Sequence, residues 1–256
     1  KELLMLRHPT LEKLHTLRLS GMARAFEQQL TMPDIETLST EERLGLMADC
    51  ELTERHQRRL KTRLRRAKLR HDAAIEDIDY RHPRGLDKSL MTTLATSTWV
   101  RQHHNVLICG PTGIGKSWLA CALAHKACRD GLSALYVRVP RFFRELSIAK
   151  GDGRYPKLIS ALAKTELLVF DDFGSSTLKD EHRRDLLEIL EDRYGLRSTL
   201  VTSQFPVKNW HELIGDPTLA DAILDRLVHN AYKIHLKGES MRKRRNKLTH
   251  TGHSDS

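Results

Sequence analysis

Eight consecutive residues in the middle of the chain have the spacing of a phosphate-binding loop. They fit the pattern G-x-x-x-x-G-K-[ST] and are Gly110, Pro111, Thr112, Gly113, Ile114, Gly115, Lys116 and Ser117. Glycine adopts the positive φ angles that bring successive backbone N–H groups close to phosphate oxygens. Lys116 is expected to reach the β and γ phosphates, and the Ser117 hydroxyl is expected to bind Mg²⁺. The loop therefore predicts a nucleotide-binding site.

Two adjacent carboxylates end a second apolar run further along the chain. Asp171 and Asp172 follow four apolar residues at 167–170. Such a run is typical of a buried strand in a parallel sheet, whose carboxyl end faces the nucleotide crevice. Asp171 is expected to hold Mg²⁺, directly or through water, and Asp172 to orient or deprotonate the attacking water. An Asp-Asp pair alone also fits a simple turn, but together with the loop it predicts hydrolysis of ATP.

A third group of polar residues ends the strand expected over 198–204. Ser203 or Gln204 could contact the γ phosphate or the attacking water. A plain strand cap explains these residues equally well. The sequence leaves both interpretations open.

These side chains need a sheet to hold them. Apolar runs at 106–109, 134–137, 167–170, 198–204 and 231–236 alternate with helical patterns at 118–129, 142–149, 181–194 and 219–229. Strands that alternate with helices predict an α/β fold, with a mostly parallel sheet flanked by helices on both faces. A further helix is expected over 86–100. We expect this ATPase core to occupy residues 81–242, followed by a disordered basic and polar tail at 243–256.

The residues before the core predict a small all-α domain over 1–80 that binds DNA or a partner. Apolar residues within the first thirty positions recur at helical spacing, as one helix or as two helices broken at Ser20-Gly21. Thr37 to Thr40, followed by Glu41 and Glu42, predicts the start of a longer helix that extends to residue 70.

The second half of that helix is strongly basic. Residues 55–70 contain nine basic side chains and no acid, namely Arg55, Arg58, Arg59, Lys61, Arg63, Arg65, Arg66, Lys68 and Arg70. Five of the arginines recur every three or four positions and therefore share one helix face. A solvated charged face is the simpler alternative. Because arginine predominates and its planar donors suit phosphate, we expect the helix to bind the backbone of duplex DNA with weak sequence specificity.

The overall composition agrees with an anionic partner. Forty-three Lys and Arg residues face 33 Asp and Glu residues, which gives a formal net charge of +10. The four cysteines have no C-x-x-C spacing and the histidines have no ligand spacing, so we expect reduced thiols and no metal site built from Cys and His. No apolar run approaches the roughly 18 residues that span a membrane. A cytoplasmic protein without membrane contact is expected.

The order of these motifs resembles the IstB family. The resemblance rests on residues 110–117, 167–174, 202–204, 223–229 and 238–242, together with 17–26 and 51–70 near the start. Members are AAA+ ATPases that accompany a transposase in bacterial insertion sequences, and they are relatives of the DnaC helicase loader. The resemblance covers nearly the whole chain and implies an AAA+ P-loop core preceded by the small helical domain.

The resemblance also implies roles that spacing alone does not give. Arg226 matches the arginine finger that reaches the γ phosphate bound by a neighbouring subunit, which implies a homo-oligomer with shared ATP sites. Arg242 matches a second phosphate sensor. Gln204 stands where many relatives place a sensor Asn. Asp172 stands where most AAA+ proteins carry Glu, although the family's own pattern is Asp-Asp, so slow hydrolysis stimulated by DNA and oligomerisation is expected.

We interpret the sequence as an ATP-dependent DNA-binding oligomer that selects or remodels target DNA and recruits the transposase of its element. A loader of a replicative helicase is the nearest alternative, because the same ATPase would serve a different protein client. A third interpretation is a scaffold that assembles when ATP binds and does not need ATP hydrolysis. A small-molecule kinase is the fourth, but it would leave the basic helix unexplained.

Overall fold

The computed structural model describes residues 8–241, and the chain divides into two compact units, Lys1–Thr62 and Arg63–Ser256. The boundary between the units falls within helix α3 (Thr40–Ala67). Arg242 and the tail expected at 243–256 lie outside the described residues. The sequence-based fold class is confirmed, since helices open the chain and a parallel sheet flanked by helices follows.

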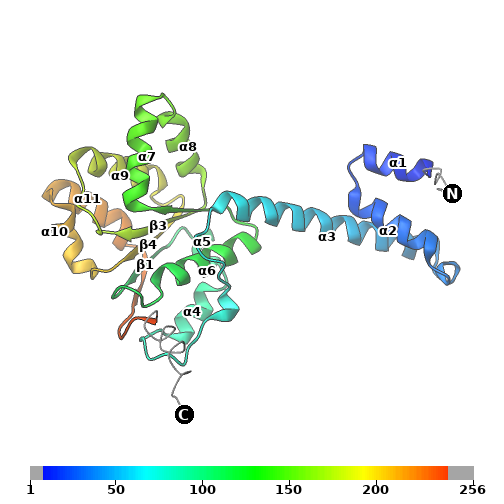
Figure 1. Cartoon of the computed structure of the whole chain (residues 1–256), viewed down its shortest axis with the longest axis horizontal. Coiled ribbons are helices and arrows are strands. Elements are labelled where there is room, and N and C mark those ends of the chain that lie inside the picture. The colour runs from blue at the N-terminus through cyan, green and yellow to red at the C-terminus, as the bar shows by residue number, and fades with distance from the viewer. Residues whose placement is uncertain (1–7, 242–256) are drawn as a thin grey trace, which may run out of the picture. The chain divides into compact units, whose positions relative to one another are not determined.

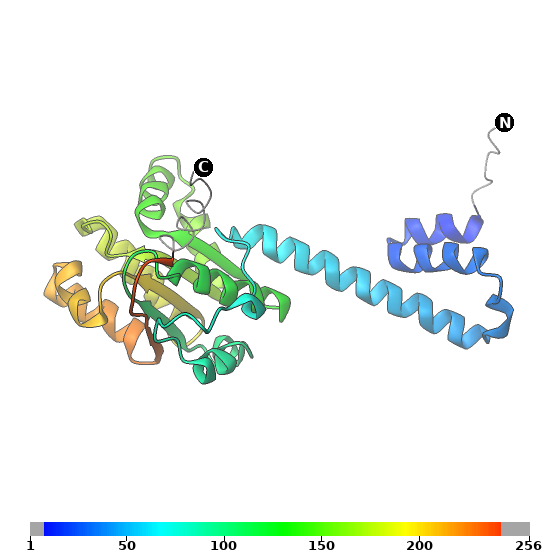
Figure 2. The same cartoon turned by 60° about the horizontal axis from the view of Figure 1, so that its bottom comes forward.

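In the described part of the first unit, residues 8–62, the chain forms two short helices and most of a long third one. Helix α1 (Pro9–Thr16) and helix α2 (Ser20–Thr31), drawn in blue in Figure 2, pack on each other, and a short 3-10 turn, η1 (Ile35–Thr37), leads into α3. The helix break expected at Ser20-Gly21 lies just before it, at residues 17–19. Gly21 allows α2 to approach α3 closely, because an added Cβ would lie 2.5 Å from the Cys50 carbonyl oxygen.

Both α2 and α3 have identifiable caps. The Glu51 carboxylate of α3 accepts hydrogen bonds from the backbone N–H groups of Gly21 (2.7 Å) and Met22 (3.3 Å), so it caps the first turn of α2. Ser39 and Glu42 form a reciprocal capping box in which each side chain accepts a backbone N–H of the other residue. This box explains why α3 begins where the sequence predicts.

Helix α3 ends at Ala67, so the expected helix through residue 70 is too long. Lys68 follows with φ = 51°, a left-handed conformation that terminates a helix. Arg70 therefore does not continue the helical stripe that its spacing predicts.

The second unit is built on a five-stranded sheet in the order β2 (Ala134–Arg138), β3 (Leu167–Phe173), β4 (Ser198–Ser203), β1 (Asn105–Cys109) and β5 (Ala231–His235). The four neighbouring strand pairs are parallel. Their carboxyl ends therefore meet along one edge of the sheet, which is the edge that α/β proteins use for ligands.

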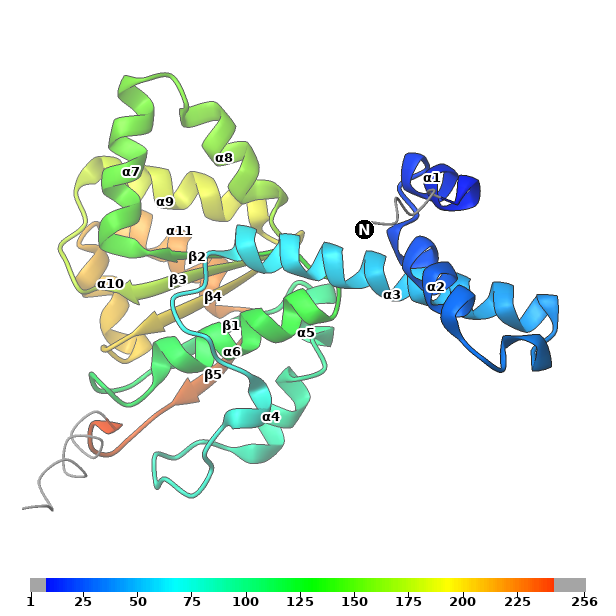
Figure 3. The same cartoon turned by 45° about the vertical axis from the view of Figure 1, so that its right-hand side comes forward.

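Helices cover both faces of this sheet (Figures 1 and 3). Helix α6 (Lys116–Arg129) packs against β1, β2, β3 and β4 on one face, with α4 (Lys88–Leu94) and α5 (Thr98–Arg101) nearby. The other face carries α7 (Val139–Gly151), α8 (Tyr155–Lys164), α9 (Asp180–Arg193), α10 (Trp210–Ile214) and α11 (Pro217–Val228). Two 3-10 turns, η2 (Ile75–Asp77) and η3 (Val207–Asn209), complete the described elements.

Alternation along the strands builds the core. Leu107, Phe170 and Val201 point to the face covered by α7 to α11 and join one buried apolar cluster there. Three parts of the core differ from the sequence-based expectation. Helix α8, which begins beside Pro156, and the short helix α10 were not anticipated. The helix expected over 86–100 is split into α4 and α5, since Ser97 adopts φ = 55°.

Candidate nucleotide-binding site

The predicted phosphate-binding loop connects the end of β1 to the start of α6. Its glycines adopt positive φ angles, and Gly115, with φ = 100°, forms the N-cap of α6. A Cβ added to Gly110 would lie 2.5 Å from the Leu236 carbonyl oxygen, and one added to Gly115 would lie 2.7 Å from an Arg84 nitrogen. The loop thus lies at the positive end of the α6 dipole, a position that favours a bound phosphate group.

Lys116 and the buried Arg84 hold the loop. The Lys116 ammonium donates hydrogen bonds to the carbonyl oxygens of Gly110 (2.7 Å) and Pro111 (2.9 Å). Arg84, which is buried, donates to the Ile114 carbonyl oxygen (3.2 Å), and its burial lowers the pKa of the guanidinium. No motif predicted a role for Arg84, because its neighbours resemble a domain boundary.

Asp171 is fully buried at the carboxyl end of β3. Its Oδ1 accepts hydrogen bonds from the hydroxyls of Ser117 (2.7 Å) and Thr202 (2.6 Å), and its Oδ2 accepts one from the Tyr136 hydroxyl. The structure therefore brings the two residues predicted to bind Mg²⁺ into direct contact. Tyr136 and Thr202 were not anticipated; both lie on strands beside β3, at or near the carboxyl end.

The donor set fits a magnesium ion that a nucleotide accompanies. A hydroxyl and a carboxylate supply hard oxygen ligands, which Mg²⁺ prefers. Within residues 8–241, no group of three or more His, Cys, Asp or Glu side chains could hold a metal ion alone. Phosphate oxygens and water would therefore have to complete the coordination shell, as they do in phosphoryl-transfer sites.

Asp172 occupies a β-bulge. The pairing of β3 with β4 shifts register between Phe170 and Phe173, and Asp172 adopts φ = 62°, which Asp tolerates better than most residues. Its carboxylate forms an ion pair with the Nε of Arg138 (2.6 Å), at the end of β2. The bulge turns two successive acids toward different partners. Arg138 was not predicted, although it ends a strand beside β3.

The two polar residues at the end of β4, Ser203 and Gln204, have different surroundings. Ser203 is buried and donates a hydrogen bond to the Phe173 carbonyl oxygen (2.8 Å), which is the behaviour of a strand cap. Gln204 is exposed and accepts a hydrogen bond from the Thr112 hydroxyl in the loop (3.2 Å). Of the two open candidates, Gln204 is therefore the one beside the phosphate-binding loop.

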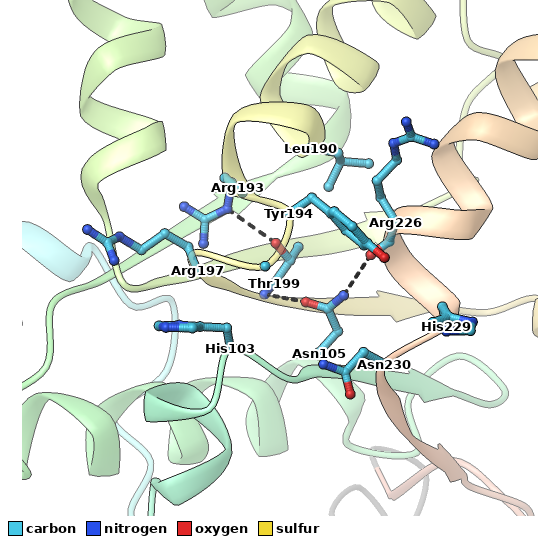
Figure 4. A pocket seen from close by; sticks show the side chains of 11 residues that line it. His103, Asn105, Leu190, Arg193, Tyr194, Arg197, Thr199, Arg226, His229 and Asn230 are labelled. Carbon is cyan, nitrogen blue, oxygen red and sulfur yellow. Dashed lines mark hydrogen bonds between the residues drawn. The ribbon is translucent and has the colours of Figure 1, made fainter.

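Arg226 lies at the opposite end of β1 from the loop. Its carbonyl oxygen accepts a hydrogen bond from Asn105, the first residue of β1, at 2.9 Å (Figure 4). Its guanidinium forms an ion pair with Glu191 (2.7 Å). A cavity of about 350 Å³ opens here and is lined by His103, Asn105, Leu190, Arg193, Tyr194, Gly195, Arg197, Thr199, Arg226, His229 and Asn230. Arg226 is not part of the site that its own chain forms.

The nine basic residues predicted to bind DNA fall into two groups. The first group contacts other residues of the chain. Arg55 pairs with Glu51 (2.7 Å), and Arg63 donates to the Cys128 carbonyl oxygen (3.1 Å). Arg70 lies 3.9 Å from Asp171. The side chains of the second group are exposed, and no ion pair is recorded for them among the described residues; they are Arg58, Arg59, Lys61, Arg65, Arg66 and Lys68.

Comparison with known proteins identifies the family. Residues 12–249 match the model of the IstB-like ATP-binding proteins. The chain belongs to this family. The IstB-like chain is 57% identical over 239 residues to a putative insertion sequence ATP-binding protein of Sinorhizobium fredii, which covers 93% of this chain and 98% of the relative. It is also 31% identical over 229 residues to the putative ATP-binding protein of insertion sequence IS21 from Pseudomonas aeruginosa, covering 90% and 86% of the two chains.

Solved structures share the fold of this IstB-like protein. The DnaC helicase loader aligns with a TM-score of 0.56 and 21% identity, over 67% of this chain and 100% of the loader chain. DnaA of Aquifex aeolicus, solved with AMPPCP, aligns with a TM-score of 0.55 and 17% identity, over 73% and 59%. The family resemblance and the AAA+ fold inferred from the motifs are thus confirmed. Among the described helices, none is both long and apolar enough to span a bilayer.

Proposed function

We propose that this protein binds ATP with Mg²⁺ and hydrolyses it slowly, as an oligomer assembled on duplex DNA that recruits a partner transposase. The observation that carries the proposal is the 2.7 Å hydrogen bond between Ser117 and Asp171. It joins the phosphate-binding loop to the buried carboxylate of β3 at the ligand-binding edge of the sheet. The names of the relatives, which are insertion sequence ATP-binding proteins, support the same reading.

Each residue of the site has a distinct part in this reaction. The loop N–H groups and Lys116 bind phosphate oxygens, while Ser117 and Asp171 hold the metal ion. Bound Mg²⁺ supplies neutralisation of the negative charge that develops on the transferred phosphoryl group. Asp172 orients or deprotonates the attacking water once Arg138 releases its carboxylate, and Gln204 contacts the water or the γ phosphate.

The position of Arg226 supports shared sites. An arginine at the amino end of β1 cannot serve the loop at the carboxyl end of the same strand. A second copy, packed head to tail, would bring its Arg226 to that loop and complete the site. Glu191 holds the guanidinium until the copies meet. Arg242, which lies outside the described residues, stays a proposed second phosphate sensor.

The exposed basic residues of α3, and Lys68 after it, support contact with DNA. They carry no recorded carboxylate partner among the described residues, so neighbouring like charges remain uncompensated until an anion binds. Phosphate contacts of this kind carry no sequence information, which predicts weak sequence preference.

A helicase loader is the second candidate, supported by the alignment with the whole DnaC chain. The two candidates share the ATPase and differ in the protein client. Affinity capture of the purified protein with the transposase encoded beside it, or with the replicative helicase of the same cell, separates them. Binding to the helicase alone would favour the loader.

The test of the proposed function is the ATPase rate per subunit, measured against protein concentration with and without nonspecific duplex DNA. The proposal predicts that the rate rises with both and that Arg226→Ala abolishes the gain. A rate per subunit that changes neither with protein concentration nor with added DNA would overturn the shared-site mechanism. A scaffold that needs only ATP binding would keep its assembly and its transposase stimulation in Asp172→Asn.

A further inference from the structure

Arg70 reaches the carboxylate that is expected to hold the metal ion. The segment after α3 places the Arg70 guanidinium 3.9 Å from Oδ2 of Asp171. The guanidinium also interacts with Tyr136, whose hydroxyl donates a hydrogen bond to the same Oδ2. A cation from the region before the core therefore contacts the metal site, both directly and through one tyrosine.

Hydrogen bonding of Asp171 does not require this arginine. The two oxygens of Asp171 already accept hydrogen bonds from Ser117, Tyr136 and Thr202. The guanidinium adds positive charge to a fully buried carboxylate, where charges are screened less than at the surface. An arginine guanidinium stays protonated throughout the physiological pH range, so the positive charge of Arg70 is permanent.

Because the Arg70 guanidinium is positively charged, it repels a second cation, such as Mg²⁺, that binds the Asp171 carboxylate. We propose that Arg70 is a positioning residue that antagonises Mg²⁺ at Asp171, so that docking of the segment around residue 70 and binding of Mg²⁺ with ATP weaken each other. The inference rests on the proposed function, because it takes Asp171 as the metal-binding carboxylate. Coulomb repulsion between the guanidinium and the metal ion is its physical basis.

The antagonism gives the basic segment a way to sense nucleotide. Arg66 and Lys68 are exposed and lie within four residues of Arg70, in the same unit. If DNA phosphates on these residues draw the segment away from Asp171, DNA strengthens binding of Mg²⁺ with ATP. Linkage then requires that Mg²⁺ with ATP strengthen DNA binding by the same factor.

The test compares the affinity of the full-length protein for a fluorescent ATP analogue in Mg²⁺ and in EDTA. Arg70→Gln should tighten binding in Mg²⁺ about three- to tenfold and leave binding in EDTA unchanged. Arg70→Lys, which keeps the charge, should behave like the wild type. The matched control is Arg129→Gln, because Arg129 is 40% exposed and pairs with a carboxylate, Glu76, as Arg70 is 41% exposed and lies beside Asp171.

A second readout follows the segment itself. Amide hydrogen exchange at residues 68–72 should accelerate when Mg²⁺ and the ATP analogue bind the wild type, but not when the analogue binds in EDTA. Equal Mg²⁺ dependence in the wild type and Arg70→Gln would overturn the inference alone. Weaker binding of Arg70→Gln in Mg²⁺ would also overturn it, because Arg70 would then assist the metal. If the wild type binds no nucleotide, the proposed function fails and takes this inference with it.

Discussion

Asn105 donates a hydrogen bond to the carbonyl oxygen of Arg226 at 2.9 Å, and this contact fixes Arg226 at the amino end of β1. The phosphate-binding loop leaves the carboxyl end of the same strand. In the proposed function, one chain therefore carries the two halves of a phosphoryl-transfer site at opposite ends of its sheet. Such an arrangement favours head-to-tail assembly, in which each interface combines the loop of one copy with the arginine of the next.

The loop lysine should control nucleotide affinity. Lys116→Ala removes a charge-assisted contact to phosphate, which is worth about 1.5–3 kcal/mol, so affinity for ATP should fall about ten- to 100-fold. Equilibrium titration with a fluorescent ATP analogue measures this change. Lys126→Ala removes another ammonium from α6, one that pairs with Asp130, and should leave the affinity unchanged. Equal affinities of the two variants would contradict the assignment of the loop.

The second acid of the pair should act in turnover and not in binding. Asp172→Asn keeps the size of the side chain but removes the base, so the ATPase rate should fall about 10²- to 10⁴-fold while ATP affinity stays within a fewfold of the wild type. Single-turnover hydrolysis together with a binding titration separates the two effects. Asp152→Asn serves as the control, since Asp152 is an exposed carboxylate that pairs with Arg154. Unchanged turnover in Asp172→Asn would show that Asp172 is not the base and that another group activates the water.

Acid should weaken the first unit through Glu51. Burial alone would raise the pKa of this carboxyl, but hydrogen bonds from Arg55, Gly21 and Met22 outweigh burial and lower the pKa below its usual 4.5. A lowered folded-state pKa contributes stability above the unfolded value, and that stability is lost as pH falls through the folded value. Glu51→Gln should cost about 1–3 kcal/mol at neutral pH.

Thermal unfolding followed by circular dichroism from pH 7 to pH 3 checks this expectation. The difference in melting temperature between the wild type and Glu51→Gln should shrink below pH 4.5. Glu54→Gln removes an exposed pair with Arg24 and should change the melting temperature little at any pH. A constant difference between the wild type and Glu51→Gln would show that the carboxylate charge has no part in capping α2.

Exposed arginines of α3 should set the salt dependence of DNA binding. Arg59→Gln should weaken binding to unrelated duplex sequences by the same factor and reduce the slope of log affinity against log salt by about one. Fluorescence anisotropy over a salt series measures both quantities. Arg141→Gln alters an arginine of α7 that is exposed and pairs with Glu145, so it should leave the slope as it is. Equal slopes for both variants would indicate that the basic residues of α3 form a solvated face that does not bind DNA.

Motifs with fixed spacing predicted much of the sheet edge. The loop, Asp171 and Asp172 have one-dimensional signatures because strand, turn and helix follow each other without interruption. The alternation of strands and helices likewise predicted the parallel sheet. The buried Arg84 and the ion pair of Arg138 with Asp172 left no such signature, since they depend on which segments meet in space.

The basic run shows where periodicity reaches its limit. Equal spacing placed Arg59, Arg63 and Arg70 on one helix face. Lys68 ends the helix in a left-handed conformation, however, and Arg70 turns toward Asp171. Helical spacing says which residues share a face only while the helix continues. Tertiary contacts decide where α3 ends, because the buried Ala67 and the hydrogen bond of Arg63 hold the last turn of the helix against the core.

The most direct test of the central claim is the ATPase activity of an equimolar mixture of Lys116→Ala and Arg226→Ala. At an ATP concentration near the wild-type dissociation constant, each variant alone should have little activity. Lys116→Ala lacks the phosphate contact, and Arg226→Ala lacks the arginine from the neighbouring copy. Random assembly leaves about one interface in four with an intact loop facing an intact arginine, so the mixture should recover about a quarter of the wild-type rate. If the mixture stays as inactive as its components while both variants still assemble, the site is not shared between copies.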